Sequence, residues 1–250
     1  MNNEKVNMPA PVLQIKNLKK SFGENHVLRD FTCDLFEGEN VVVLGKSGSG
    51  KSVLIKCIIG LMPPDNGSIR VFGEEVTEFS NEKLDDMRVK VGFLFQSNAL
   101  YDSMTVRQNL EFPLRRHWNK DEKGSVNDLV MDALTNVGLA ETVDMMPAEL
   151  SGGMRKRIAL ARTLILKPKI ILYDEPTTGL DPITAKEISN LMLDIQKKYN
   201  TSSIIISHDL NCVKITANRI LMLIDGICYA TGTYEELKKS QDKKVKQFFD

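Results

Sequence analysis

The sequence predicts an α/β protein built on a largely parallel sheet, because short apolar runs alternate with longer stretches of helical periodicity. The clearest of these runs are residues 41–44, 91–95, 170–174 and 203–206. A glycine-rich loop follows the first run, and polar or charged residues follow the others. Ligands bind beyond the carboxyl ends of parallel strands, so these residues are expected to converge on one site.

Composition restricts the class of protein. At 250 residues the chain is long enough for one large domain or two small ones, and 42% apolar with 26% charged residues is ordinary for a globular protein. Basic and acidic residues number 33 each, so no net charge draws the protein to nucleic acid. The four cysteines lack Cys-x-x-Cys spacing, which argues against zinc and a disulfide framework. No spanning segment or signal peptide is evident, and we expect a cytoplasmic protein.

Residues 45–52 read GKSGSGKS and fit G-x-x-x-x-G-K-[ST] at every constrained position. The glycines let backbone N–H groups turn inward, and a helix over 51–60 adds the partial positive charge of its N-terminus. This geometry suits a nucleoside triphosphate. Lys51 would reach the β- and γ-phosphates, and the Ser52 hydroxyl would be a ligand of Mg²⁺. The alternative, a chance match in a Gly/Ser-rich turn, does not account for the strand before the loop and the helix after it.

The first part of the chain predicts several strands around this loop. Residues 12–18 form a strand that turns at the sequence KSFG, which supplies Phe22, and a second strand covers 27–36. A Pro-Pro-Asp-Asn-Gly turn then precedes a strand over 68–72. Ser80 is expected to cap a short helix that ends near Met87.

The middle of the chain predicts a helical insertion. Thr105 and Gln108 form a capping box for a helix that Pro113 should kink or end, and 115–124 should be a polar loop. A second helix starts at Ser125 and ends at Gly138. The sequence Leu-Ser-Gly-Gly at 150–153 opens a third helix, which should stop before the proline at 168.

The α/β pattern then returns. Asp181 is expected to cap a helix with proline in its first turn, and Asp209 to cap another after the strand at 203–206. Asp225 and Gly226 indicate a type I′ hairpin. The Lys-rich segment 235–250 is expected to be helical, either as a solvated helix or as an element that docks on a neighbouring chain.

Five residues at or just after the predicted strand ends are the candidate catalytic and metal-binding groups: Ser52, Gln96, Asp174, Glu175 and His208. Asp174 would bind Mg²⁺ directly or through water, with a helix cap as the alternative. Glu175 would polarise the attacking water, or it could be a surface acid. His208 would contact the γ-phosphate unless it is an ordinary loop histidine. Gln96 could complete the Mg²⁺ shell and sense the γ-phosphate.

The segment 150–153 is a second potential anion cradle, because Ser151, Gly152 and Gly153 lie at a helix N-terminus. By itself it could be no more than a helix cap. Together with the first cradle it suggests that two chains hold ATP between them.

The combination of GKSGSGKS, Gln96, LSGGM, ILYDEP, the Gly-Leu-Asp turn ending at Asp181, and His208 resembles the nucleotide-binding subunits of ATP-binding cassette (ABC) transporters, in the same order and over nearly the whole chain. The resemblance implies a P-loop NTPase fold over 12–248. A RecA-like core with an N-terminal antiparallel β subdomain would comprise 12–97 and 160–234, a helical subdomain 98–159, and a C-terminal tail 235–250.

The resemblance also implies ATP hydrolysis with Mg²⁺ by a head-to-tail homodimer. Ser151 and Gly153 of one subunit would contact ATP held by Lys51 of the other, and Asp181 would link the two sites. Phe22 matches the aromatic residue that stacks on adenine, which is more often tyrosine. The residues expected to bind nucleotide are Phe22, Gly45, Lys46, Ser47, Gly48, Ser49, Gly50, Lys51, Ser52, Val53, Gln96, Ser151, Gly152, Gly153 and Asp181. Lys46 stands where Pro, Glu or Asn is common.

Within this family, residues 95–106 and Met154 are similar to ATPases of Mla/Mce-type phospholipid transport systems, since most other importers carry glutamine at the position of Met154. The implied partners are a membrane permease that docks near Gln96 and Tyr101 and an Mce-type lipid-binding protein, with no nucleic acid. The subunit would be peripheral, on the cytoplasmic face of the inner membrane.

Other functions compete with this interpretation. An ABC system for amino acids, metals or lipoproteins is the first alternative. A soluble ABC ATPase acting on DNA or ribosomes, or a P-loop kinase, fits less well, because the first typically carries coiled coils, zinc-binding cysteines or paired cassettes and the second has no use for LSGGM.

Overall fold

The computed structural model describes residues 10–117 and 125–249, so the first nine residues and most of the loop expected at 115–124 lie outside the described part. The strands are β1 (Leu13–Phe22), β2 (Asn25–Leu35), β3 (Asn40–Leu44), β4 (Asn66–Val71), β5 (Glu74–Glu75), β6 (Val91–Leu94), β7 (Ile170–Asp174), β8 (Ser202–Ser207), β9 (Arg219–Ile224) and β10 (Ile227–Gly232). The α-helices are α1 (Lys51–Ile58), α2 (Asn81–Lys90), α3 (Val106–His117), α4 (Val126–Asn136), α5 (Gly152–Leu164), α6 (Pro182–Tyr199), α7 (Leu210–Thr216), α8 (Tyr234–Lys238) and α9 (Lys243–Lys246).

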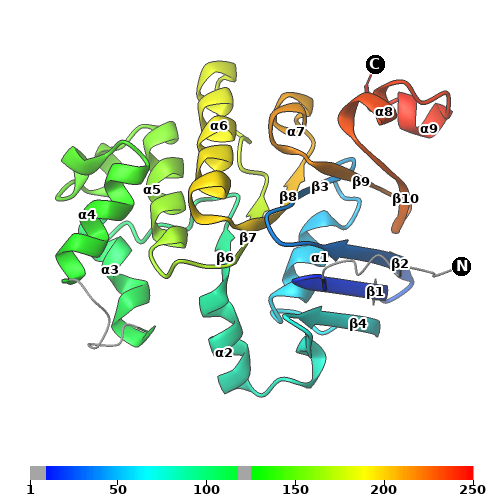
Figure 1. The fold of residues 1–250 in the computed structure, drawn as a ribbon, viewed down its shortest axis with the longest axis horizontal. Helices are drawn as coiled ribbons and strands as arrows, with labels where there is room; N and C mark the ends of the chain where they lie inside the picture. Colours follow the sequence, from blue (N-terminus) through cyan, green and yellow to red (C-terminus); the bar gives the residue numbers. More distant parts are fainter. Residues whose placement is uncertain (1–9, 118–124, 250) are drawn as a thin grey trace, which may run out of the picture.

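The strands form a sheet in the order β5-β4-β1-β2-β10-β9-β3-β8-β7-β6. Strands β9, β3, β8, β7 and β6 pair in parallel, whereas β2, β1, β4 and β5 pair antiparallel. The predicted P-loop NTPase fold, a parallel core with an N-terminal antiparallel β region, is therefore confirmed (Figure 1). Crossover through helices places the carboxyl ends of β3, β6, β7 and β8 at one edge.

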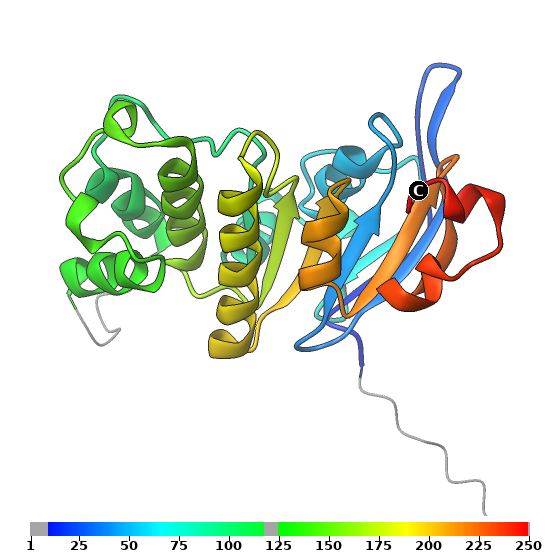
Figure 2. The same cartoon turned by 90° about the horizontal axis from the view of Figure 1, so that it is seen from above.

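Both faces of the parallel strands are buried, which explains why their sequences are continuous apolar runs. In β3, Val41 and Val43 pack in a core with α1 and the antiparallel strands, and Val42 and Leu44 pack in a second core with α5, α6 and α7. Figures 1 and 2 show α5, α6 and α7 in a row along one side of these strands. Because successive side chains of a strand point to opposite faces, each strand contributes residues to both cores.

A third core joins α3, α4 and α5 into the predicted helical unit. Both predicted starts are confirmed: Thr105 and Gln108 bond reciprocally at 3.0 and 3.2 Å, and Ser125 caps α4. Helix α5 belongs to two cores, because Leu160 faces the sheet and Ala161 faces α3 and α4. The boundary placed between 159 and 160 falls inside this helix, and the division into subdomains remains a prediction.

Two predicted ends differ from the structure. Strand β1 continues to Phe22, which pairs with Asn25, and the turn lies at Gly23, whose φ of 59° suits glycine. Helix α3 passes through Pro113 and ends at His117, so the polar loop begins later than expected. Proline removes one backbone hydrogen bond, and the burial of Leu110 and Leu114 on the core face outweighs that loss.

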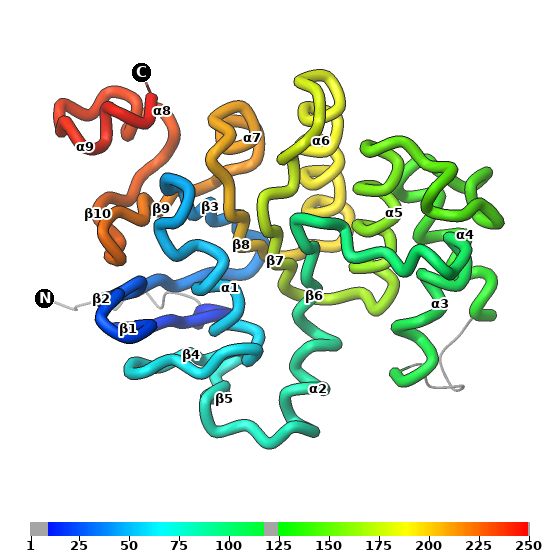
Figure 3. Tube along the Cα trace, turned by 180° about the vertical axis from the view of Figure 1, so that it is seen from behind, coloured from blue at the N-terminus to red at the C-terminus, as the bar shows by residue number. Residues whose placement is uncertain are grey.

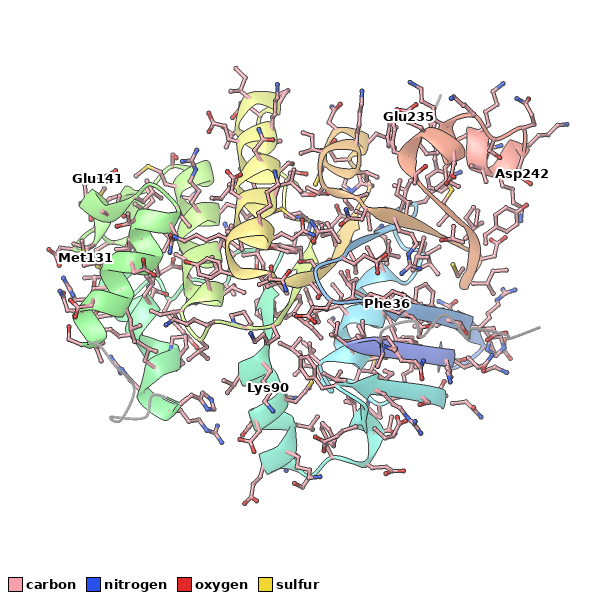
Figure 4. The ribbon with its side chains drawn as sticks, viewed as in Figure 1. Phe36, Lys90, Met131, Glu141, Glu235 and Asp242 are labelled. Carbon is pink, nitrogen blue, oxygen red and sulfur yellow. The ribbon has the colours of Figure 1, made fainter. Side chains whose placement is uncertain are left out.

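The C-terminal segment is not a solvated helix. It folds into α8 and α9, whose Leu237 and Val245 are 5% and 2% exposed and belong to the core shared with α5, α6 and α7. Phe248 packs against the same core, and Figure 4 shows Glu235 and Asp242 on the outside of this segment. The tail docks on its own chain, because its few apolar residues belong to this core or pack against it.

We expect Leu237→Ala to lower the free energy of unfolding by about 2–4 kcal/mol, because the truncation leaves a cavity beneath α8. Urea titration monitored by circular dichroism measures the change. Lys238→Ala, an exposed position on the same helix, is the control and should stay within about 0.5 kcal/mol of the parent. Equal stability of both variants would contradict a docked tail.

Candidate active site

The loop between β3 and α1 has the geometry of a phosphate cradle. A Cβ added at Gly45 would lie 2.6 Å from Ser49 Oγ and 2.8 Å from Leu223 O, so only glycine fits there. Gly50 has a φ of 98°, which a residue with a side chain rarely adopts. The Lys51 ammonium donates to the carbonyl oxygens of Gly45 at 2.8 Å and Lys46 at 3.1 Å, which holds it over the loop.

The cradle fits a nucleoside triphosphate. The Ser49 hydroxyl is buried and has no hydrogen-bond partner among the described residues, so it is available to a phosphate oxygen. The Lys51 ammonium lies beside it at the start of α1, where the helix dipole also favours an anion.

The end of β7 fits Mg²⁺. Ser52 Oγ donates to Asp174 Oδ1 at 3.3 Å, which brings together two of the oxygens expected to bind the ion. Burial raises the pKa of Asp174 and the hydrogen bond from Ser52 opposes that change. No group of three or more His, Cys, Asp or Glu side chains that could hold a metal ion occurs in 10–117 and 125–249. Gln96 is exposed at the end of β6, beside β7, with no side-chain contact to Asp174.

Glu175 has a constrained backbone and several partners. Its φ of 50° is left-handed, which is unfavourable for a non-glycine residue, and its N–H donates to Ile206 O on β8 at 3.0 Å. Glu175 as a whole is 8% exposed. Its carboxylate lies 3.5 Å from Lys51 Nζ and accepts a hydrogen bond from Thr178 Oγ1 at 3.3 Å. The structure thus aims this carboxylate at the phosphate cradle.

His208 is brought to Glu175 across 33 residues of sequence. Its Nδ1 lies 2.7 Å from Glu175 Oε2, and its side chain is 60% exposed. Asp209 caps α7 behind it, as predicted. Because one ring nitrogen contacts Glu175, the other is free to face a ligand, which is compatible with the predicted γ-phosphate contact.

The segment 150–153, predicted to be a second anion cradle, lies elsewhere in the fold and begins with a helix cap. Ser151 caps α5, because its Oγ accepts from Met154 N at 3.2 Å. A Cβ on Gly153 would lie 2.6 Å from Thr184 Cγ2 on α6, so glycine allows the two helices to approach. Viewed from behind in Figure 3, and also in Figure 1, α5 lies on the opposite side of β6 and β7 from α1. One chain therefore does not bring its two cradles together.

Asp181 is confirmed as the cap of α6. Its carboxylate accepts from Ile183 N at 3.0 Å and Thr184 N at 3.1 Å. The hydrogen bond from the Thr184 hydroxyl, aided by these backbone donors, lowers the pKa of Asp181. It stays ionised at an exposed surface near the start of α5.

Two further residues predicted to contact nucleotide, Phe22 and Lys46, lie on different parts of the surface. Phe22 is 48% exposed at the tip of the hairpin, with Lys20 Nζ 5.8 Å from its ring centre. Lys46 points to the tail, where its Nζ lies 6.0 Å from the ring centre of Phe248. A cavity of about 430 Å³ is lined by β2, the glycine-rich loop and the C-terminal tail. Phe22 is not among its lining residues.

Sequence reasoning assigned no role to Lys156, which is 2% exposed in the middle of α5. Its ammonium donates to Gln96 O at 2.9 Å. Burial lowers the pKa of Lys156 to about 8, and the Asp174 carboxylate opposes that change. Its place four residues before Leu160, on the buried face of the helix, was the available signal.

A phosphate cradle, a hydroxyl and carboxyl pair suited to Mg²⁺, and an aimed glutamate define the chain as a P-loop ATPase. Residues 28–178 match the model of the ABC transporter family, and the chain belongs to that family.

Relatives with assigned names support the family and divide on cargo. The chain is 41% identical over 97% of its length, and 70% of the relative, to the probable ribonucleotide transport ATP-binding protein mkl of Mycobacterium leprae. It is 36% identical over 96% of its length, and 91% of the relative, to the intermembrane phospholipid transport system ATP-binding protein MlaF of Haemophilus influenzae. It is also 35% identical over 95% of its length, and 75% of the relative, to the methionine import ATP-binding protein MetN of Campylobacter jejuni.

A solved structure supports the same family. The ATP-binding cassette MJ0796, in a dimeric post-hydrolysis state bound to ADP and phosphate, superposes with a TM-score of 0.79 at 30% identity. The match covers 89% of this chain and 98% of that one.

We expect Glu175→Gln to lower ATP turnover about a hundredfold to a thousandfold, because an amide cannot accept a proton from water. ATP binding should persist, since the cradle is unchanged.

Lys51→Ala should weaken nucleotide binding itself, because it removes the ammonium over the loop. Phosphate release and equilibrium binding of a fluorescent ATP analogue separate the two effects. Turnover at the parent rate in Glu175→Gln would remove Glu175 from its catalytic role.

Proposed function

We propose that this chain is the ATP-hydrolysing subunit of an ABC transporter and that it energises the movement of phospholipid through a partner permease. The match to the ABC transporter family supports the transporter assignment, and the observation that carries the two-chain site is the separation of the two predicted anion cradles in one chain. A single copy cannot clasp one triphosphate from both sides, whereas two copies arranged head to tail can. The dimeric neighbour, which holds ADP and phosphate, supports this arrangement.

In this proposed dimer each site residue is given one role. Lys51 and the glycine-rich loop bind the phosphates, and Ser52, Asp174 and Gln96 would hold Mg²⁺, which would supply positive charge against the phosphate oxygens. Glu175 orients and polarises the attacking water.

Two further groups complete the proposed dimer site. His208, positioned by Glu175, contacts the γ-phosphate. Ser151 and Gly153 come from the second copy, and Asp181 lies beside them at the start of α6 to link the two sites.

The surface beside Gln96 suits a membrane permease. A groove of about 330 Å³ lies between α1, α2, β6 and α5 and is lined mainly by apolar side chains. Phe95 is 39% exposed in it, and the exposed rings of Tyr101 and Phe112 pack together 4.8 Å apart on the adjoining surface. Exposed aromatic residues of this kind mark protein contacts.

A permease would also place the subunit at a membrane. None of the helices in the described part of the chain has both the length and the apolar character to span a bilayer. We propose that the subunit is peripheral, on the cytoplasmic face of the inner membrane.

Phospholipid is the favoured cargo. The relative from Haemophilus influenzae is covered over 91% of its length, more than the other two relatives described above. Met154 and residues 95–106 add to this support, and we propose an Mce-type lipid-binding protein as a further partner. An ABC importer of an amino acid, metal or lipoprotein is the second candidate, favoured by the methionine-import relative.

We expect Ser151→Arg, made in the Glu175→Gln background, to block the ATP-dependent dimer. The large cation would occupy the position that faces the partner's triphosphate. Light scattering after size exclusion measures the dimer, and nucleotide binding to the isolated subunit should change little. Ser125→Arg removes a comparable cap on α4 and should leave the dimer intact. A dimer that forms equally well with Ser151→Arg would contradict the two-chain site.

We expect a permease and an Mce-type protein to co-purify with the tagged chain from detergent-solubilised membranes of the native organism, identified by mass spectrometry. Phe95→Asp should release the permease, because it places a charge in the apolar groove. Phe72→Asp, which alters a phenylalanine of equal 39% exposure on the antiparallel region, should not. Turnover of the purified complex should rise with phospholipid. Stimulation by methionine instead would replace the lipid assignment with the second candidate.

A further inference from the structure

Lys156 occupies an environment that ordinarily excludes a charge. It lies in α5, five residues after Ser151, and its side chain is almost completely buried. A buried ammonium is unfavourable unless it is hydrogen bonded and near opposite charge. Here the donor reaches Gln96 O at 2.9 Å, and the carboxylate of Asp174 is close enough to favour the charged form. This side chain thus joins α5 to the carboxyl ends of β6 and β7.

The rest of the loop after β6 is tied to the same helical unit. Arg162, also on α5, donates to Asn98 O at 3.0 Å and to Ala99 O at 2.8 Å. Asn98 and Ala99 both have left-handed φ angles, of 65° and 50°, which orient these carbonyl groups. Further along, Asn109 of α3 accepts from Tyr101 N at 2.8 Å and donates to Tyr101 O at 3.1 Å.

All side-chain hydrogen bonds to the backbone of 96–105, within the described part of the chain, come from α3 or α5. The loop therefore belongs mechanically to the helical unit, although it follows a strand of the parallel core. Lys156 makes the contact at Gln96 itself, nearest to the metal-binding residues.

We infer that Lys156 is a positioning residue that fixes the main chain of Gln96 to α5, so that the Gln96 side chain approaches Mg²⁺ in step with the helix that presents Ser151 to the partner subunit. This inference rests on the proposed function for the roles of Gln96 and Ser151. The hydrogen-bonded attachment of the loop to α5 does not depend on that function.

The test compares Lys156→Met with Lys156→Arg in the full-length protein. Methionine keeps an unbranched apolar stem but loses the donor and the charge, whereas arginine keeps both. Lys197→Met, an exposed lysine on α6, is the matched control. The first readout is hydrogen–deuterium exchange of residues 96–99, and the second is the Mg²⁺ concentration that gives half-maximal ATP turnover.

We expect Lys156→Met to speed exchange of 96–99 and to raise the half-maximal Mg²⁺ concentration, each by about tenfold, which is the size expected for a lost charge-assisted hydrogen bond. Arginine should restore most of both values, and Lys197→Met should match the parent. If the methionine variant does not fold, Lys156→Gln is measured with the same readouts, and both should change in the same direction, because the charge is lost and the shorter side chain leaves only a neutral amide donor.

Two results would overturn the inference. Unchanged exchange of 96–99 would show that Lys156 does not hold the loop. Faster exchange with an unchanged Mg²⁺ requirement would reduce Lys156 to a structural contact. Failure of the proposed function has a different signature, which is absence of an ATP-dependent dimer in Glu175→Gln with Lys156 intact.

Discussion

Burial of both faces of the parallel strands is the constraint on which the site depends. Each of β3, β7 and β8 offers side chains to two cores, so apolar residues fill the middle of these strands, where an unpaired polar group would be costly. Polar chemistry can begin only where the strands end. The Ser52 hydroxyl, the Asp174 and Glu175 carboxylates and the His208 imidazole therefore gather at one edge of the sheet, although together they span more than 150 residues of sequence.

The left-handed backbone of Glu175 shows how firmly that edge is held. Such a conformation costs about 1–3 kcal/mol and persists only when its surroundings impose it. Here a backbone hydrogen bond to β8, the Thr178 hydroxyl, the Lys51 ammonium and the His208 ring all fix the residue. The cost of the strained backbone is offset by preorganisation of a carboxylate that need not move when substrate binds.

Much of this arrangement could be predicted from local sequence rules. Helix caps at Ser151 and Asp181 follow from side chains that accept backbone N–H groups, and apolar runs give the strands whose ends define the site. Long-range pairings could not be predicted. Lys156 lies one turn before the buried Leu160, but the carbonyl of Gln96 and the carboxylate of Asp174, which favour its charged form, come from distant segments that local rules do not bring to α5. The docking of the tail on its own chain could not be predicted either, because Leu237 and Val245 are too sparse to form an apolar stripe at helical spacing.

Helix α5 packs in two cores at once, and this packing determines which neighbouring segment can move. Ala159, Leu160 and Leu164 pack with the sheet while Ile158, Ala161 and Ile165 pack with the helical unit. Moving α5 against either core would expose several apolar side chains, at about 1.5–3 kcal/mol for each large one. A single charge-assisted hydrogen bond contributes about as much as one of them. Displacement of the loop after β6 is therefore easier than displacement of the helix, and the ties from Lys156 and Arg162 determine how closely that loop follows α5.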